Sequence, residues 1–423
     1  MVLPRKPNNI YFPAVCHGQH NKKSLIFVAS MANLEIYTTR FKRLSTRAFP
    51  GTISCVAFQS SSGKIAVSVS SSVYICIFGD DPSLTCQIQG EYDCLAPVTC
   101  LEWGRNCQLL VTCARLLILK SDQLKELTPV LDAPLDSSIN TIKAGWSHNC
   151  KYIAVLSTQS PYILIFELRG SRLKKVSILQ STERVLYFDW RQTLDASAPC
   201  ALLTRSAKNV TKIWQESQID SVYKFNMLAV LEPGYPPRNS SLDPPIHWLT
   251  THAFHEAMQS QMTLDLALAE MFHEFPDMLF QVSESGSMTI WGIQGLTCSV
   301  HKSARVSLIL KTEGDTFSQR FTPFFTGHVS MLFDSPLTHG LNAPQLIILA
   351  GTKFALECYC LNLRDLLAKA WITPALTLLF SWHGPSKSIS NVSRHPLNNL
   401  VFISDVDDSN TIYEFHTRPV HVN

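Results

Sequence analysis

Two short stretches carry residue types that could do chemistry, and both are incomplete. His255-Glu256 begins like the helix of a zinc metalloprotease, but Gln259 stands where the second histidine ligand would be needed. The run from Ser61 to Lys64 has the Gly-Lys pair of a phosphate-binding loop. It lacks the upstream glycine and the following Ser or Thr. We therefore expect no zinc site and no nucleotide-phosphate site at these positions.

Other reactive side chains are present without the spacing that chemistry requires. Four histidines fall close together, and we interpret them as surface or capping residues: His247, His252, His255 and His273. The chain has neither a Cys-x-x-Cys pair for structural zinc nor a Gly-x-Ser-x-Gly turn for a nucleophilic serine. We expect no catalytic, cofactor-binding or metal-binding residue, and predict that the protein is not an enzyme.

Composition narrows the class of protein further. The 423 residues carry a net charge of +3, which gives no overall field for nucleic acid. Thirteen cysteines lie largely inside apolar runs, where reduced cysteine acts as a small apolar side chain. The longest uncharged apolar-rich run, Ala370 to Trp382, is shorter than the roughly 20 residues that cross a bilayer. We expect a cytoplasmic protein that reaches membranes only through its partners.

The elements that must position any site repeat four times between Thr52 and Glu216. Each copy opens with a short β-rich run that ends in an aromatic residue: Phe58, Trp103, Trp146 and Trp190. These aromatics stand 45, 43 and 44 residues apart. Two further short runs rich in Val, Ile, Thr and aromatics follow each one, bounded by turn residues. This period is typical of WD-repeat β-propeller blades, which run to about 40–45 residues.

A four-stranded blade has two apolar faces, and a ring of blades covers both. We therefore predict an all-β fold, a single WD-repeat β-propeller over residues 1–423. Eight strand–turn–strand hairpins can be counted. Seven blades followed by the start of a further unit is the favoured interpretation, and eight blades also fit. The segment 389–423 is then either the last blade or the start of a following propeller. Residues 9–15 are expected to form the first strand, and they could return to complete the last blade.

Two insertions interrupt the repeat. Residues 232–245 contain five prolines, which rules out a strand ladder and predicts a surface loop. A new run then opens at Trp248. Residues 256–275 follow with apolar residues at helical spacing, and Pro276 ends the pattern. We predict an amphipathic helix inserted between two strands.

The predicted helix is the first candidate for binding a partner. Its first row of side chains is Met258, Met262, Leu266 and Glu270. An adjacent row holds Leu264, Leu268, Met271, Phe272 and Phe275. Residues 251–300 contain six acidic residues and neither Lys nor Arg. The helix could offer its Met-rich row to a partner protein, or it could pack on the propeller rim to cover its own apolar face.

The first fifty residues supply a second candidate. They hold eight Lys or Arg and one acid, Glu35, with Arg40, Lys42 and Arg43 close together. This excess would suit an acidic partner or an anionic lipid surface. The alternative is a solvated rim, because exposed strands and turns commonly carry basic residues.

Several of these runs resemble the DmX-like (rabconnectin) family. The similar stretches are 53–66, 73–78, 246–249 and 277–291, with the helical segment lying between the last two. Members of that family are very long scaffolds, whose N-terminal WD propellers belong to an assembly that helps V-type proton pumps reassociate. The resemblance implies peripheral pump subunits and other scaffold subunits as partners, on endosomal, lysosomal or synaptic-vesicle membranes. It implies no catalytic residue. This sequence holds one propeller, whereas the family continues for much longer.

Repeat and resemblance together predict a non-catalytic scaffold that binds other proteins in V-type pump assembly or regulation. One alternative is a vesicle-coat or trafficking scaffold unrelated to proton pumps. Another, from a different class, is a propeller enzyme with a site in the central channel.

Overall fold

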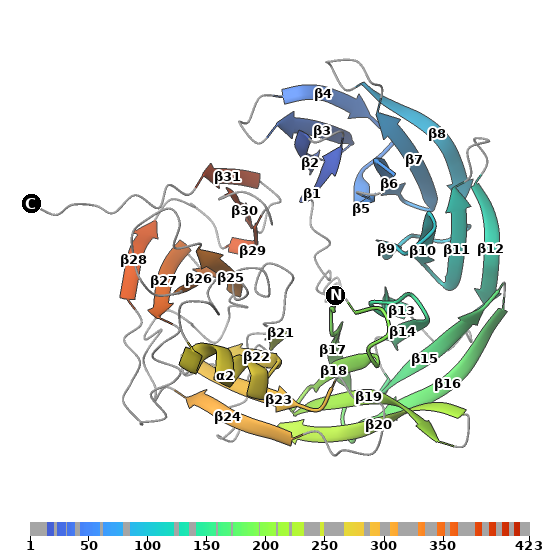
Figure 1. Cartoon of the computed structure of the whole chain (residues 1–423). Helices are drawn as coiled ribbons and strands as arrows, with labels where there is room; N and C mark the ends of the chain where they lie inside the picture. Colours follow the sequence, from blue (N-terminus) through green and yellow to red (C-terminus); the bar gives the residue numbers. More distant parts are fainter. Residues whose placement is uncertain are drawn as a thin grey trace, which may run out of the picture. The chain divides into compact units, whose positions relative to one another are not determined.

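A computed structural model gives the architecture of the chain (Figure 1). It describes residues 15–20, 23–30, 32–38, 43–59, 62–78, 85–121, 127–134, 141–157, 160–170, 172–193, 195–208, 210–219, 222–231, 246–248, 266–282, 288–296, 305–311, 329–334, 345–351, 356–362, 377–382, 389–394, 400–405 and 410–414. The chain divides into two compact units, Met1–Val185 and Leu186–Asn423.

The first unit contains four antiparallel sheets, each of four strands in chain order. The first comprises β1 (Val15–His20), β2 (Lys23–Ser30), β3 (Asn33–Thr38) and β4 (Arg43–Ala48). The second comprises β5 (Ile53–Gln59), β6 (Lys64–Val69), β7 (Ser72–Phe78) and β8 (Cys86–Asp93). The third comprises β9 (Cys100–Trp103), β10 (Gln108–Thr112), β11 (Arg115–Ser121) and β12 (Leu127–Pro134). The fourth comprises β13 (Thr141–Trp146), β14 (Tyr152–Ser157), β15 (Tyr162–Arg169) and β16 (Arg172–Gln180).

The second unit continues the same plan. Its first sheet comprises β17 (Val185–Trp190), β18 (Ala201–Ser206), β19 (Thr211–Ile219) and β20 (Val222–Leu231). The next comprises β21 (His247–Trp248), β22 (Asp277–Val282), β23 (Met288–Gln294) and β24 (Arg305–Lys311), with helix α2 (Leu266–Glu274) between β21 and β22. A third comprises β25 (Val329–Asp334), β26 (Gln345–Gly351), β27 (Leu356–Asn362) and β28 (Thr377–Trp382). The last has three described strands, β29 (Ile389–Arg394), β30 (Leu400–Asp405) and β31 (Asn410–Glu414).

The aromatic period is confirmed as the mark of the first strand in four of the described sheets. Phe58 lies near the end of β5, and Trp103, Trp146 and Trp190 end β9, β13 and β17. The second strands are the most thoroughly buried part of the repeat, since every residue of β14 and β18 is buried. β14, a run that is apolar except for Ser157, is therefore a strand covered on both faces, and β18 also buries the polar residues at its end.

Hydrogen bonds join the first strands of neighbouring sheets, or the residues directly after them. In the first unit, Trp103 Nε1 donates to the Ala57 oxygen at 3.0 Å, and Gln59 Nε2 donates to the Gly104 oxygen at 3.2 Å. In the second unit, Trp248 Nε1 donates to the Asp189 oxygen at 3.3 Å. The first strand of a sheet is thus tied to the first strand of the sheet before it.

A single irregularity recurs between the third and fourth strands. In each of the seven four-stranded sheets, the register shifts once at this pairing. The fourth strand carries the unmatched residue, which is Leu44, Gln89, Val130, Val176, Leu228, Ile309 or Leu379. A β-bulge of this kind bends the strand and raises its local twist.

The structure bears differently on the predicted first strand, the predicted Pro-rich loop and the predicted number of blades. The strand that pairs with β2 is Val15–His20, and not the expected residues 9–15, of which 9–14 lie outside the described residues. The run from Val15 to His20 is weak in β-formers, but it pairs along its whole length. The Pro-rich stretch 232–245 lies outside the described residues. The described strands form eight sheets, and the number of blades in one ring stays a prediction.

Candidate partner-binding site

Helix α2 is the part of the predicted helix that the structure describes. Residues 256–265, including Met258 and Met262, lie outside the described residues. The helix ends at Glu274, and the Phe275 nitrogen makes a last helical hydrogen bond to the Met271 oxygen at 2.8 Å. Pro276 follows, which confirms the predicted stop because proline cannot continue the ladder.

The two rows of this helix have different surroundings. Phe272 and Phe275 are buried, at 5% and 9% exposure. On the other row Leu266 is 81% exposed, and Glu270 is also exposed. One face therefore packs on the protein, while the described end of the predicted docking row faces solvent. A leucine this exposed leaves apolar area for a partner to cover.

Phe275, the residue after α2, packs closely against Gly292 of β23. A Cβ placed on Gly292 would lie 2.6 Å from the Phe275 ring and 2.6 Å from Cδ1 of Ile309 in β24. Real Cβ atoms do not approach other carbons so closely, so the close packing of the phenyl ring depends on glycine. The helix is thus held against its own sheet.

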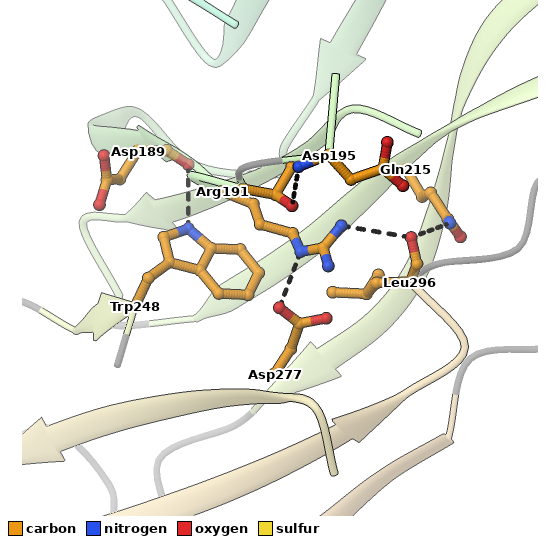
Figure 2. Close-up of polar contacts among 8 residues, drawn as sticks. Asp189, Arg191, Asp195, Gln215, Trp248, Asp277 and Leu296 are labelled. Carbon is orange, nitrogen blue, oxygen red and sulfur yellow. Dashed lines mark hydrogen bonds and ion pairs between the residues drawn. The ribbon is translucent and has the colours of Figure 1, made fainter. Parts of the chain in front are cut away.

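A buried ion pair fixes the strand that follows the helix (Figure 2). Arg191 Nε donates to Asp277 Oδ1 at 2.7 Å, and the two side chains are 6% and 1% exposed. Arg191 Nη1 and Gln215 Nε2 both donate to the Leu296 oxygen, at 3.4 and 3.2 Å. Asp277 opens β22, so the pair joins the end of β17 to the chain directly after α2. Because both charges are buried and paired, we assign this cluster to holding the two sheets together.

Sequence reasoning missed the role of Arg191 and Asp277. They are 86 residues apart, and the span between them contains both insertions, so the repeat period gives no link. A signal was nonetheless present. Arg191 directly follows the closing Trp190, and Asp277 directly precedes the buried run Met278 to Phe280. A charged side chain next to a buried strand needs an oppositely charged or hydrogen-bonding partner.

The basic candidate is only partly described. Arg40 and Lys42 lie outside the described residues. Arg43 on β4 is 62% exposed, and its Nη1 lies 3.8 Å from Glu35 Oε1. Arg47 on the same strand is exposed as well. An exposed pair of this kind is worth little, so Arg43 remains able to meet an acidic partner.

Leu95 is a second exposed apolar residue, which the sequence did not indicate. It is 78% exposed in the connection between β8 and β9, and its backbone has φ of 60°. Its nitrogen donates to Asp93 Oδ1 at 2.9 Å. A leucine in the left-handed region is strained, and such strain marks positions where the surrounding structure holds the backbone firmly.

The described residues contain no group of three His, Cys, Asp or Glu side chains placed to hold a metal ion. Among their helices, none has the length and apolarity needed to cross a membrane.

Solved structures identify the fold. Sqt1 of Saccharomyces cerevisiae matches with a TM-score of 0.61 over 95% of both chains, at 9% identity. Sqt1 of Chaetomium thermophilum matches with a TM-score of 0.62, also over 95% of both chains and at 9% identity. The β-propeller domain of Myceliophteria thermophila Cps50 (Swd1) matches with a TM-score of 0.51, at 12% identity, over 86% of this chain and 97% of that one. The fold is that of a WD-repeat β-propeller.

At 9–12% identity, these likenesses carry the fold and leave the function to this chain's own residues. No protein-family model matches the sequence, and no curated protein matches it. The all-β propeller prediction is confirmed, while membership of the DmX-like family stays a prediction.

Proposed function

We propose that this chain is a non-catalytic WD-repeat scaffold that binds other proteins and serves the assembly or regulation of V-type proton pumps. The observation that carries the scaffold role is the exposure of Leu266 on a helix whose opposite face is buried. A propeller gives a firm frame for such an element, and loops on firm frames commonly bind partners. The link to proton pumps rests on the resemblance of the four sequence stretches to the DmX-like family.

Helix α2 is the proposed docking element. Phe272 and Phe275 hold it to its sheet, and the Arg191–Asp277 pair fixes the strand that leaves it. A helix already held in place loses little freedom on binding, which favours affinity. Glu270 and Glu274 are exposed beside Leu266, so the complementary partner segment carries basic residues around an apolar one.

The basic strand β4 is the second proposed surface. Arg43, with Arg40 and Lys42 shortly before it in the sequence, would meet acidic residues on another subunit of the same assembly. This contact would add electrostatic attraction that weakens as salt rises. The protein would then work in the cytoplasm and at the surface of endosomal, lysosomal or synaptic-vesicle membranes, held there through its partners.

Binding to purified peripheral subunits of a V-type pump tests the function. We expect the 1–423 protein to bind at least one of them. Leu266→Ser should weaken that binding about tenfold, because truncating an apolar anchor costs about 1.4 kcal/mol or more. Ile178→Ser is the matched control, since Ile178 is also exposed, at 52%, but lies on β16. Equal effects of the two substitutions would remove α2 from the proposal.

Binding to purified vesicle-coat subunits, and to none of the pump subunits, under the same conditions would instead favour a trafficking scaffold. Residues 1–423 are also proposed to form one propeller. A single urea transition, seen together by tryptophan fluorescence and far-UV circular dichroism, would support one cooperative domain. Two separate transitions would contradict it.

A further inference from the structure

Cys76 and Cys86 form a close pair of thiols in the β5–β8 sheet. Cys86 lies opposite Phe78, and Cys76 lies opposite Ile88, so the two cysteines are diagonal neighbours on the same face of adjacent strands. They are 0% and 7% exposed, and both belong to the same apolar cluster. Each thiol shifts the pKa of the other, raising it at Cys76 and lowering it at Cys86, through their side-chain interaction. The chain thus places two reduced cysteines next to each other on one face of adjacent strands.

Their surroundings make the two thiols unequal. The side-chain interaction with Cys76 lowers the pKa of Cys86, burial opposes this, and the positive charge of Arg47 lowers it further. By contrast, burial raises the pKa of Cys55 to about 11 and that of Cys100 to about 12. Thiolate is the reactive form of cysteine, so Cys86 is the more reactive member of the pair.

We propose that Cys76 and Cys86 are an oxidation-sensitive dithiol that closes to a disulfide on exposure to hydrogen peroxide. The Cys86 sulfur attacks one peroxide oxygen, the O–O bond breaks, and water leaves as Cys86 becomes a sulfenic acid. The Cys76 sulfur then attacks the Cys86 sulfur and displaces the hydroxyl group as a second water. Two thiols are oxidised by two electrons, and one peroxide is reduced to two waters.

The sheet geometry indicates what closure would do. Diagonal partners in a sheet stand further apart than direct ones, so a disulfide pulls the start of β8 toward β7. The unmatched residue Gln89 lies three residues further along β8, where the ladder is already interrupted. The bulge lets the first part of β8 shift without displacing the part that follows it. Oxidation of the Cys76–Cys86 pair does not depend on which partner the protein binds.

Peptide mapping of the whole chain under non-reducing conditions tests the pair. The reduced 1–423 protein is treated with an equimolar amount of hydrogen peroxide, alkylated and digested. We expect one cross-linked peptide joining Cys76 to Cys86, lighter by two hydrogen atoms and lost on treatment with dithiothreitol. Absence of that peptide from a protein that keeps its circular dichroism spectrum would overturn the proposal, as would a bridge between other cysteines.

Variants separate the roles of the two thiols. Cys76→Ser should leave Cys86 as a sulfenic acid that dimedone labels, because the resolving thiol is gone. Cys86→Ser should leave Cys76 unlabelled under the same exposure. Cys55→Ala is the control and should form the Cys76–Cys86 bridge as fully as the unmodified chain. Dimedone labelling of Cys76 in the Cys86→Ser variant would show that Cys86 is not the reactive member.

Discussion

The indole Nε1 of Trp103 donates a hydrogen bond to the backbone oxygen of Ala57, in the neighbouring sheet, at 3.0 Å. Trp146 holds the same place one repeat later, but its Nε1 is buried and has no hydrogen-bond partner among the described residues. The same residue type at the same repeat position therefore has a satisfied donor in one sheet and an unsatisfied donor in the next.

This difference predicts opposite results for one isosteric change. Benzothienylalanine replaces Nε1–H by sulfur and keeps the two-ring shape. At position 103 it should lower the free energy of unfolding by about 1 kcal/mol, the usual net value of a hydrogen bond. At position 146 it should leave stability unchanged or raise it, because a buried unsatisfied donor is removed. Urea unfolding measures both, and a loss at 146 equal to that at 103 would contradict the assignment.

The Arg191–Asp277 pair predicts strong coupling. Arg191→Met and Asp277→Leu should each cost about 3–5 kcal/mol, because each leaves the other charge buried without its partner. The double variant should be less destabilised than either single one. Denaturant unfolding of all four proteins gives the coupling energy. Additive losses would mean that the two side chains act separately.

Gly292 predicts a steric result. Gly292→Ala should lower stability by about 1–3 kcal/mol, since the new carbon would overlap the Phe275 ring and Ile309. Adding Phe275→Leu should recover part of the loss by making room. Gly104→Ala is the comparison, because there the new carbon would come no closer than 3.0 Å to Trp146. Thermal unfolding should show the smaller loss at position 104.

The strained backbone at Leu95 predicts a gain in stability. Leu95→Gly should raise the free energy of unfolding by about 0.5–1 kcal/mol, because glycine adopts positive φ without a Cβ penalty. Leu95→Ala keeps the strain and should change little, as the side chain is largely exposed. Urea midpoints of the two variants check the prediction, and a gain for alanine would assign the effect to side-chain exposure instead.

Cys100 predicts a loss of stability at alkaline pH. Burial raises its pKa from 9.0 to about 12. Above pH 9 the unfolded chain releases the thiol proton while the folded chain keeps it, so unfolding becomes easier until about pH 12. The slope from this thiol approaches about 1.4 kcal/mol per pH unit. Cys100→Ala should therefore show a shallower fall of the urea midpoint over this range, and no change in pH dependence below pH 9.

The repeat was predictable from sequence because its inner strands combine two strong signals. They are rich in apolar residues, and four first strands carry an aromatic residue at or near their ends at even spacing, as Phe58 and Trp103 illustrate. The fourth strands were harder to predict from the sequence. β8 and β16 alternate between buried and exposed residues only in part, since the unmatched Gln89 and Val176 change which side chains face the core.

The sequence predicted that the candidate site contains an amphipathic helix, but not which of its two rows packs on the protein. Helical spacing and Pro276 located the end of α2, and its two rows predicted that one face would pack. Which row packs depends on Gly292 and Ile309, which arrive later in the chain and give no local signal. The partner of Asp277 lies beyond both insertions, so only the folded arrangement brings Arg191 to it.

The unmatched residue that recurs between third and fourth strands has a consequence at high protein concentration. An outermost strand with straight, regular amide groups would be a template on which a second molecule could grow a cross-β fibre. In each of the seven four-stranded sheets described, that template is broken at the corresponding place, from Leu44 to Leu379. We therefore expect the described fourth strands to be poor templates for fibre growth, while their exposed side chains remain available for specific contacts.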